Sequence, residues 1–352
     1  MNATKVELPG ISFENWRPAL APILESTSQP GYRATQVLEW VFQRQAADFE
    51  SMNNVPRVLR EELSEVTTLH PLTLDQDQVS SDGTRKFLWR REQGDSIESV
   101  MIPEGTRRTF CISTQAGCPV RCTFCATGYG GFTGQLSPAE IVDQVLQTTL
   151  ESEVPPTNLV FMGMGEPLLN FDAVLQSIAV LSHPKQVALS PRRITVSTVG
   201  IPSRIIELAH AFPRVKLALS LHAVRDDLRD EIIPLNQKHP LKELLAAAAE
   251  HQRTTGKYVT FEYVVLPDVN DSPQDARELG RLLSDIPSRI NLIGFNPFPE
   301  APYQRPKVQR LTDFRTAIQE HFEGPVTIRR SRGEDIQGAC GQLSLSHGNS
   351  SS

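Results

Sequence analysis

The apolar residues divide the chain into three regions with different periodicities. In residues 14–68, apolar positions recur at the three- and four-residue spacing of amphipathic helices. One such segment spans 31–43 and a second spans 55–66; the first has its apolar face at Val37, Leu38, Val41 and Phe42. The pattern predicts a small all-helical domain over residues 1–75, which is either a nucleic-acid module or an appendage that only packs on the rest of the chain.

The second region, residues 76–103, has the pattern of a β-hairpin. Its strand-like segments are separated by Asp82-Gly83 and by Gly94-Asp95, and Asp and Gly are typical of tight turns. We therefore expect this hairpin to connect the helical domain to the remainder of the chain.

In the third region, residues 104–343, strand-like and helical patterns alternate. Counting from 107–114, six apolar strand segments are each followed by an amphipathic segment; the other five are 158–165, 193–200, 215–223, 258–266 and 290–298. Such alternation is typical of parallel strands joined by right-handed crossovers. Six units favour an open, partial (β/α)6 barrel in the α/β class, and a doubly wound sheet is the competing architecture.

Several local signals mark the ends of the predicted elements. Ser137, Ser272 and Thr312 occupy positions expected for helix N-caps, and Gly256 a position expected for a C-cap. A last strand is expected over 325–333. The Ser-rich tail, 344–352, is expected to be disordered.

Composition places the chain among globular proteins of the cytoplasm. Of 352 residues, 39% are hydrophobic and 22% charged, and no apolar run approaches the roughly 20 residues of a membrane span. The N-terminus lacks the pattern of a secretory signal. Five cysteines, three of them in one loop, do not suit a disulfide framework, so we expect a reducing compartment. The net charge of −6 gives no global sign of nucleic-acid binding.

The chemistry of the sequence is concentrated in the segment CPVRCTFC. It holds Cys118, Cys122 and Cys125 at spacings of four and three residues. A structural zinc site needs four ligands, and the next histidine downstream is His183. Three thiolates without a fourth ligand favour an iron–sulfur cluster that leaves one iron open. Zinc remains the alternative.

Polar residues follow the predicted strands at their carboxyl ends, where parallel α/β folds collect ligands. They are Gly165-Glu166, Ser197, Ser220-Leu221-His222 and Asn296. Glu166 is either a ligand for an ammonium group or an ordinary turn residue, and a single histidine such as His222 is more often structural. Four polar strand ends together favour a shared ligand.

The two remaining cysteines are far apart in the sequence. Cys111 lies on the strand before the cysteine-rich loop, and Cys340 lies near the C-terminus. Each alone is typical of a buried, inert thiol. If the end of the chain folds back over the mouth of the barrel, both reach one cavity.

A set of motifs resembles a known family. They run in order from about residue 31 to 343: DGTRKFLW, IESVMIP, CISTQAGCPVRCTFCATG, FMGMGEPLLN, ITVSTVG, LALSLHA, RDEIIPLN, GFNPFP and RGEDIQGACGQL. The chain is similar to the radical S-adenosylmethionine (SAM) methyltransferases that modify carbon 2 of adenine in 23S rRNA, the RlmN family. It departs from many relatives in the ATGYGGF segment after Cys125, where they have an STAQ-like stretch.

The resemblance implies a site and a mechanism. Cys118, Cys122 and Cys125 would bind a [4Fe-4S] cluster. SAM would be bound by Gly165, Glu166, Ser197, Ser220, Leu221, His222 and Asn296. Two SAM molecules would be used per turnover, one to methylate Cys340 and one to generate a radical. Cys340 would then link to the base, Glu98 would accept the proton, and Cys111 would release the product, leaving a transient disulfide with Cys340.

The resemblance also implies partners and leaves two alternatives. The expected substrates are adenine 2503 of 23S rRNA and adenine 37 of tRNA, with a flavodoxin-type system as the electron donor, a monomeric enzyme and no membrane. Cfr-type enzymes, which methylate carbon 8, share the five cysteines. From a different class, a non-catalytic RNA-binding protein with zinc remains open.

Overall fold

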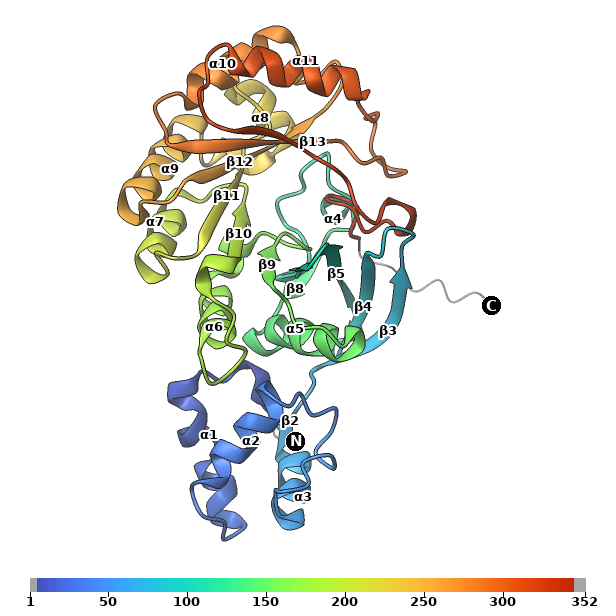
Figure 1. The fold of residues 1–352 in the computed structure, drawn as a ribbon, viewed down its shortest axis with the longest axis vertical. Helices are drawn as coiled ribbons and strands as arrows, with labels where there is room; N and C mark the ends of the chain where they lie inside the picture. Colours follow the sequence, from blue (N-terminus) through green and yellow to red (C-terminus); the bar gives the residue numbers. More distant parts are fainter. Residues whose placement is uncertain (1–4, 345–352) are drawn as a thin grey trace.

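A computed structural model describes residues 5–344 of the chain. The predicted disordered tail therefore lies outside the described residues, apart from Ser344. The first region contains three helices, shown in blue in Figure 1: α1 (Phe13–Ser26), α2 (Arg33–Phe42) and α3 (Arg57–Val66). The predicted apolar face of α2 is buried. The indole of Trp16 donates a hydrogen bond to Ala34 O at 2.7 Å, which joins α1 to α2.

The helical region packs directly on the rest of the molecule. A short 3-10 helix, η1 (Leu8–Gly10), lies against α5 (Pro138–Ser152), and Gly10 is so close that a Cβ there would lie 2.7 Å from Ala139 N. β1 (Val6–Glu7) pairs in parallel with β2 (Thr67–Thr68). The side chain of Gln176 donates to Gly10 O at 2.7 Å. Both ends of the region are thus fixed.

The second region is an antiparallel extension of the main sheet. It contains β3 (Leu72–Val79), β4 (Arg85–Arg91) and β5 (Ser96–Glu104). The predicted turns occur between them, with Gly83 at φ +83° and Gly94 at φ +91°. β3 begins at Leu72, so it crosses the predicted boundary at residue 75.

The third region forms a curved parallel sheet. In the described chain it has seven parallel strands: β6 (Arg107–Cys111), β9 (Asn158–Phe161), β10 (Ile194–Thr198), β11 (Lys216–Ser220), β12 (Val259–Val265), β13 (Ser288–Gly294) and β14 (Val326–Arg329). Their order in the sheet follows the sequence without reversal. A doubly wound sheet reverses its order at a switch point, so the structure confirms the open barrel. The last strand adds to the six predicted units.

Helices cover the outer face of this sheet (Figure 1). After α5 they are α6 (Phe171–Ser182), α7 (Pro202–Ala211), α8 (Asp226–Ile232), α9 (Leu241–Thr255), α10 (Pro273–Leu283) and α11 (Val308–Gln319). Short 3-10 helices are η2 (Pro167–Asn170), η3 (Pro191–Arg193), η4 (Pro234–Gln237) and η5 (Glu334–Ile336). No helix in residues 5–344 is long and apolar enough to cross a membrane.

Three of the four predicted caps are confirmed. Ser137 and Ser272 each form a capping box, and Gly256 ends α9 at φ +64°. The fourth is wrong, because α11 begins earlier, at Val308, and the hydroxyl of Thr312 donates to Val308 O inside the helix. A Thr within a helix can satisfy its hydroxyl this way, so the residue type alone does not mark a helix start.

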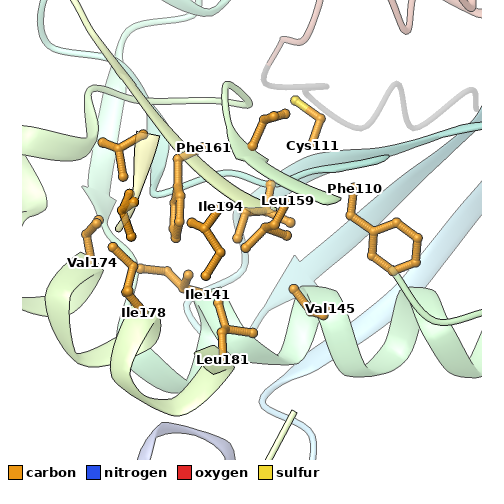
Figure 2. Packing of buried hydrophobic residues seen from close by; sticks show 14 of the residues in the cluster. Phe110, Cys111, Ile141, Val145, Leu159, Phe161, Val174, Ile178, Leu181 and Ile194 are labelled. Atoms are coloured by element: carbon orange, nitrogen blue, oxygen red, sulfur yellow. The ribbon is translucent and has the colours of Figure 1, made fainter. Parts of the chain in front are cut away.

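Alternation along the strands separates core from cavity. Figure 2 shows Phe110 directed toward the helices and Cys111, its neighbour on β6, directed to the opposite side of the sheet. Leu159, Phe161 and Ile194 pack with the apolar side chains of α5 and α6. Inward-facing residues of the strands are therefore free to line the interior of the barrel.

Candidate active site

The cysteine-rich loop is held between two short strands. β7 (Gln115–Gly117) and β8 (Phe132–Gln135) pair antiparallel and bracket it, and the one-turn helix α4 (Ala126–Tyr129) follows Cys125. A Cβ on Gly117, which has φ +76°, would lie 2.0 Å from Gly131 O. Only glycine fits there, so this residue allows the two ends of the loop to meet.

Cys118, Cys122 and Cys125 all line one cavity of about 180 Å³. Burial raises the pKa of Cys118 to about 12, and it also raises the pKa of Cys122 well above its ordinary value. Buried thiols of this kind lose their protons only when a strong positive charge is bound beside them.

The spacing of these thiols suits a cluster better than a single ion. Ligands of one zinc ion lie roughly 4 Å from each other. No three His, Cys, Asp or Glu side chains in residues 5–344 are close enough to hold one metal ion. Three thiols from one loop that line one cavity are the ligand type that holds a [4Fe-4S] cluster, so the residues present fit that group.

Gly165 and Glu166 follow β9 and lie beside the loop. A Cβ on Gly165, at φ +98°, would lie 2.5 Å from Gln115 Cβ. The glycine is thus required by the chain's own packing, not only by the approach of a ligand. Glu166 is buried and accepts hydrogen bonds from Leu168 N and Val199 N, both at 2.9 Å. Burial raises the pKa of Glu166, although these hydrogen bonds act to lower it.

Both interpretations of Glu166 therefore have support from the geometry. The carboxylate caps η2, as a turn residue would, and it also lines the cavity. Each oxygen accepts one of these backbone hydrogen bonds, and a carboxylate has acceptor capacity beyond two.

The polar ends of β10 and β11 reach the same cavity. Ser197, Ser220 and His222 line it, whereas Leu221 is fully buried and does not. His222 adopts φ +60°, and its Nδ1 accepts a hydrogen bond from Val264 N at 2.9 Å. Burial, and then the charge of Arg229, lower the pKa of His222 to about 3. The ring is therefore neutral, and its remaining proton is on Nε2.

The C-terminal segment returns to the mouth of the barrel and carries Cys340. Asn296, after β13, donates from Nδ2 to Cys340 O at 3.0 Å. Ala126 N donates to Gly341 O at 2.7 Å, and the Thr127 hydroxyl donates to Leu343 O at 2.6 Å. Cys340 is thus fixed between the cysteine-rich loop and the end of β13. Figure 1 shows this segment, in red, beside α4.

Cys111 and Cys340 line the same cavity as the cysteine-rich loop. Cys340 is exposed where the cavity opens, yet the surrounding protein raises the pKa of its thiol. Cys111 is buried at the end of β6, and burial raises its pKa to about 12. Both are free thiols.

Glu98 does not line this cavity. It is buried on β5, where Lys86 Nζ lies 2.8 Å from Oε1 and Ser344 N donates to Oε2 at 2.9 Å. The contact with Ser344 connects Glu98 to the segment that carries Cys340, and Leu343 next to it does line the cavity.

Three charged residues of the interior were not predicted. Arg229 is buried and donates to the carbonyls of Leu221, Val199 and Ser220 at 2.6–3.1 Å, so it fixes the ends of β10 and β11. Glu262 on β12 and Arg329 on β14 line the cavity. Glu262 lies in the middle of its strand, whereas Arg329 is the last residue of β14. Glu262 stands between two apolar residues, Phe261 and Tyr263. This alternation is the only sequence signal that its side chain points inward.

The fold and this site define a radical SAM enzyme. A model of the radical SAM superfamily matches residues 112–280, and a model described as the ribosomal RNA large subunit methyltransferase N-terminal domain matches residues 14–69. The chain belongs to the RlmN family. It is 41% identical to the dual-specificity RNA methyltransferase RlmN of Alcanivorax borkumensis, over 96% of this chain and 90% of that protein.

Other relatives agree with this assignment. The RlmN protein of Halorhodospira halophila is 44% identical over 96% of this chain and 93% of its own length. The crystal structure of a radical SAM methyltransferase from Sphaerobacter thermophilus is 41% identical, covers 96% of this chain and 99% of that one, and superimposes with a TM-score of 0.91. Enzymes of this superfamily use a [4Fe-4S] cluster and SAM.

Proposed function

We propose that this protein is a radical SAM RNA methyltransferase that methylates carbon 2 of adenine, at adenine 2503 of 23S rRNA and adenine 37 of tRNA. The observation that carries the proposal is the shared cavity: Cys111 and Cys340, from opposite ends of the barrel sequence, line it together with the three cysteines of the loop. Two extra thiols beside a cluster loop suit a reaction in which the protein itself carries the methyl group.

Cys118, Cys122 and Cys125 hold the [4Fe-4S] cluster in this proposal, and SAM bound beside it supplies a methyl group and radical chemistry. The SAM site comprises Gly165, Glu166, Ser197, Ser220, Leu221, His222 and Asn296. Glu166 offers a carboxylate to an ammonium group, and neutral His222 offers its Nε2 proton. Leu221 takes part only by holding the turn between Ser220 and His222, since its side chain lies in the core and its backbone groups already form hydrogen bonds within the protein.

Cys340 accepts the methyl group on its sulfur, which covalent catalysis by a thiolate permits. The hydrogen bond that its backbone carbonyl accepts from Asn296 holds this methyl acceptor at the cavity. The S-methyl group loses one hydrogen atom to the radical that SAM supplies, and the resulting methylene carbon forms a bond with carbon 2 of the base. Glu98 then accepts the proton lost from carbon 2, and the unpaired electron would return to the electron-transfer system. Cys111 attacks the sulfur of Cys340 and releases the methylated base. Glu98 is buried outside the cavity lining, and its hydrogen bond from Ser344 N ties it to the segment that carries Cys340.

The wider organisation follows from the same proposal. Residues 1–75 form an accessory domain that helps to hold RNA, 76–103 connect it, and 104–343 form the catalytic core. The enzyme acts as a cytoplasmic monomer and receives electrons from a flavodoxin-type system.

The decisive test is a nucleoside profile. RNA from cells with and without the gene is digested and compared by mass spectrometry, and the purified, reconstituted enzyme is tested on both RNAs. We expect 2-methyladenosine in both RNAs only when the gene is present. A gain of 8-methyladenosine would identify the Cfr-type reaction instead. A colourless, zinc-containing protein without SAM cleavage would contradict the enzyme assignment.

The covalent intermediate has its own test. Cys340→Ala should bind SAM and RNA without forming a protein–RNA adduct, because no acceptor sulfur is present. Cys111→Ala should form the adduct and retain it, visible as a slow band in denaturing electrophoresis that nuclease shortens and protease removes. Normal turnover by Cys111→Ala without an adduct would exclude a resolving role for this cysteine.

A further inference from the structure

Release of the methylated base requires the Cys111 thiol to lose its proton, but the surroundings of Cys111 disfavour a thiolate. In the proposed function, on which this inference rests, Cys111 attacks the sulfur of Cys340. Burial is the largest cause that raises the pKa of the Cys111 thiol to about 12. A protonated thiol is a poor nucleophile in thiol exchange. Some group in the cavity has to favour the Cys111 thiolate.

Arg329 is the positively charged residue that faces Cys111. It lies on β14, at the edge of the sheet, and lines the cavity with Cys111 and Cys340. Its charge opposes the rise in the pKa of both thiols. The negative groups near Arg329 are Glu262 and Glu104. Among the described residues neither is within ion-pair distance of it, so its charge is not neutralised by direct contact.

Met162 connects Arg329 to Cys111. Its backbone acts to lower the pKa of Cys111, and its sulfur lies 3.7 Å from Arg329 Nη1. Met162 follows β9, which pairs with β6 where Cys111 is located. The Arg329 side chain therefore reaches from β14 to the end of β9, and Met162, Arg329 and Cys111 all line the same cavity.

We propose that Arg329 is a positioning residue that activates Cys111 for product release, by placing a permanent positive charge beside the thiolate that attacks Cys340. The Cys111 thiol loses its proton to water, and its sulfur forms a bond with Cys340 Sγ as the bond from that sulfur to the methylene carbon breaks. The electron pair passes to the methylene carbon, which takes up a proton and becomes the methyl group. A thiol reductant then restores the disulfide to two thiols.

Arginine suits this role better than lysine. A guanidinium keeps its charge at any working pH, whereas a lysine can lose its proton when buried. Arg329 is half-buried, and its pKa stays raised although burial acts to lower it, so its charge is retained.

The test uses the full-length holoenzyme under anaerobic conditions with SAM, reductant and RNA. Arg329→Met should form the adduct but release it more slowly at neutral pH. The rate of release should fall about threefold to tenfold for each unit by which the pKa of Cys111 rises. Raising the pH should restore release, because it restores the thiolate. Cys111→Ala should retain the adduct at every pH. Arg330→Met removes the exposed neighbouring arginine and should behave as the wild type.

A second readout does not depend on activity. Alkylation of Cys111 by iodoacetamide, followed by peptide mass spectrometry, should require a higher pH in Arg329→Met and in Arg329→Gln than in the wild type, and Arg329→Lys should lie closer to the wild type. Wild-type release by Arg329→Met, or slow release that higher pH does not restore, would overturn the inference. If Cys111→Ala forms no protein–RNA adduct, the proposed function fails, and not only the role of Arg329.

Discussion

At the residue scale, the cysteines of the loop differ from the other two in what they must bind. Burial raises the pKa of the Cys118 and Cys122 thiols, so in the proposed site a bound cluster would supply the positive charge that favours their thiolates. In the proposed site each of the three would bind a different iron of the cluster, so none could replace another.

The first prediction follows from this division. Changing Cys118, Cys122 or Cys125 to Ala should reduce iron from about four atoms per chain to nearly none and abolish SAM cleavage. Iron and sulfide are measured after anaerobic purification. Cys111→Ala is the matched control and should retain the cluster, since it lies on a strand outside the loop. A full cluster in any of the three loop variants would contradict the ligand assignment.

Glu166 allows its two roles to be separated by a pair of substitutions. Glu166→Ala removes both the charge and the acceptors for Leu168 N and Val199 N, whereas Glu166→Gln keeps an acceptor without charge. If the carboxylate pairs with the ammonium group of SAM, both should weaken SAM binding by about 1.5–3 kcal/mol, or roughly tenfold to a hundredfold. Iron content should not change. Unchanged SAM affinity in calorimetry for Glu166→Gln would leave Glu166 as a turn residue only.

At the element scale, the C-terminal segment depends on the hairpin that precedes the barrel in the sequence. The carboxylate of Asp335 accepts from the Ser80 hydroxyl at 2.6 Å and from Ser81 N at 3.0 Å. Asp82, in the same turn, accepts from Gly333 N at 3.1 Å. The turn between β3 and β4 thus holds the start of the segment that carries Cys340.

We expect Asp335→Ala to loosen this segment without unfolding the barrel. Hydrogen exchange of the peptide spanning 333–344 should become several-fold faster, while exchange in β9 to β12 should not change. Methyl loading of Cys340 should decrease, because its sulfur is held less firmly. Asp285→Ala, at an exposed position on another loop, is the control. Equal protection in both variants would show that the Asp335 contacts do not hold the segment.

The sequence predicted the elements better than the contacts between them. Apolar runs located the six strand–helix units, and the strand ends located Glu166, Ser197, His222 and Asn296, all of which line one cavity. The close packing of Gly165 on Gln115 and the role of Arg229 at two strand ends depend on contacts between distant segments. Periodicity has no information about such contacts. For the same reason the pairing of β14 with β13 was not predicted.

At the scale of the whole molecule, a buried ionic contact joins the helical region to the barrel. His70, which follows α3 and β2, has Nδ1 2.6 Å from Asp143 Oδ1 on α5 and Nε2 2.9 Å from Ala46 O. Both ring nitrogens face acceptors, which suits a protonated imidazole. Asp143 also accepts from Leu72 N at 3.1 Å, at the start of β3. One carboxylate therefore fixes both the histidine and the chain that leaves the helical region.

This contact makes the junction between the two regions sensitive to pH. Burial acts to lower the pKa of His70, but the hydrogen bond and charge of Asp143 outweigh it and raise the pKa above 6.5. A histidine whose pKa is raised by folding stabilises the fold fully when the pH is below the ordinary histidine pKa. That contribution is lost as the pH rises through the raised pKa of the folded protein. The junction should therefore be tightest in mildly acidic solution and loosen in alkaline solution.

His70→Gln tests this directly, because glutamine can keep one hydrogen bond but cannot carry the charge. At about pH 6 the variant should be less stable than the wild type by about 1.5–3 kcal/mol, the contribution of a hydrogen bond to a charged group. At about pH 9 the difference should shrink, since the wild-type imidazole is then neutral. Thermal unfolding at both pH values measures it, with the exposed His210→Gln on α7 as the control. A stability difference that is the same at both pH values would mean that His70 packs at the junction as a neutral ring.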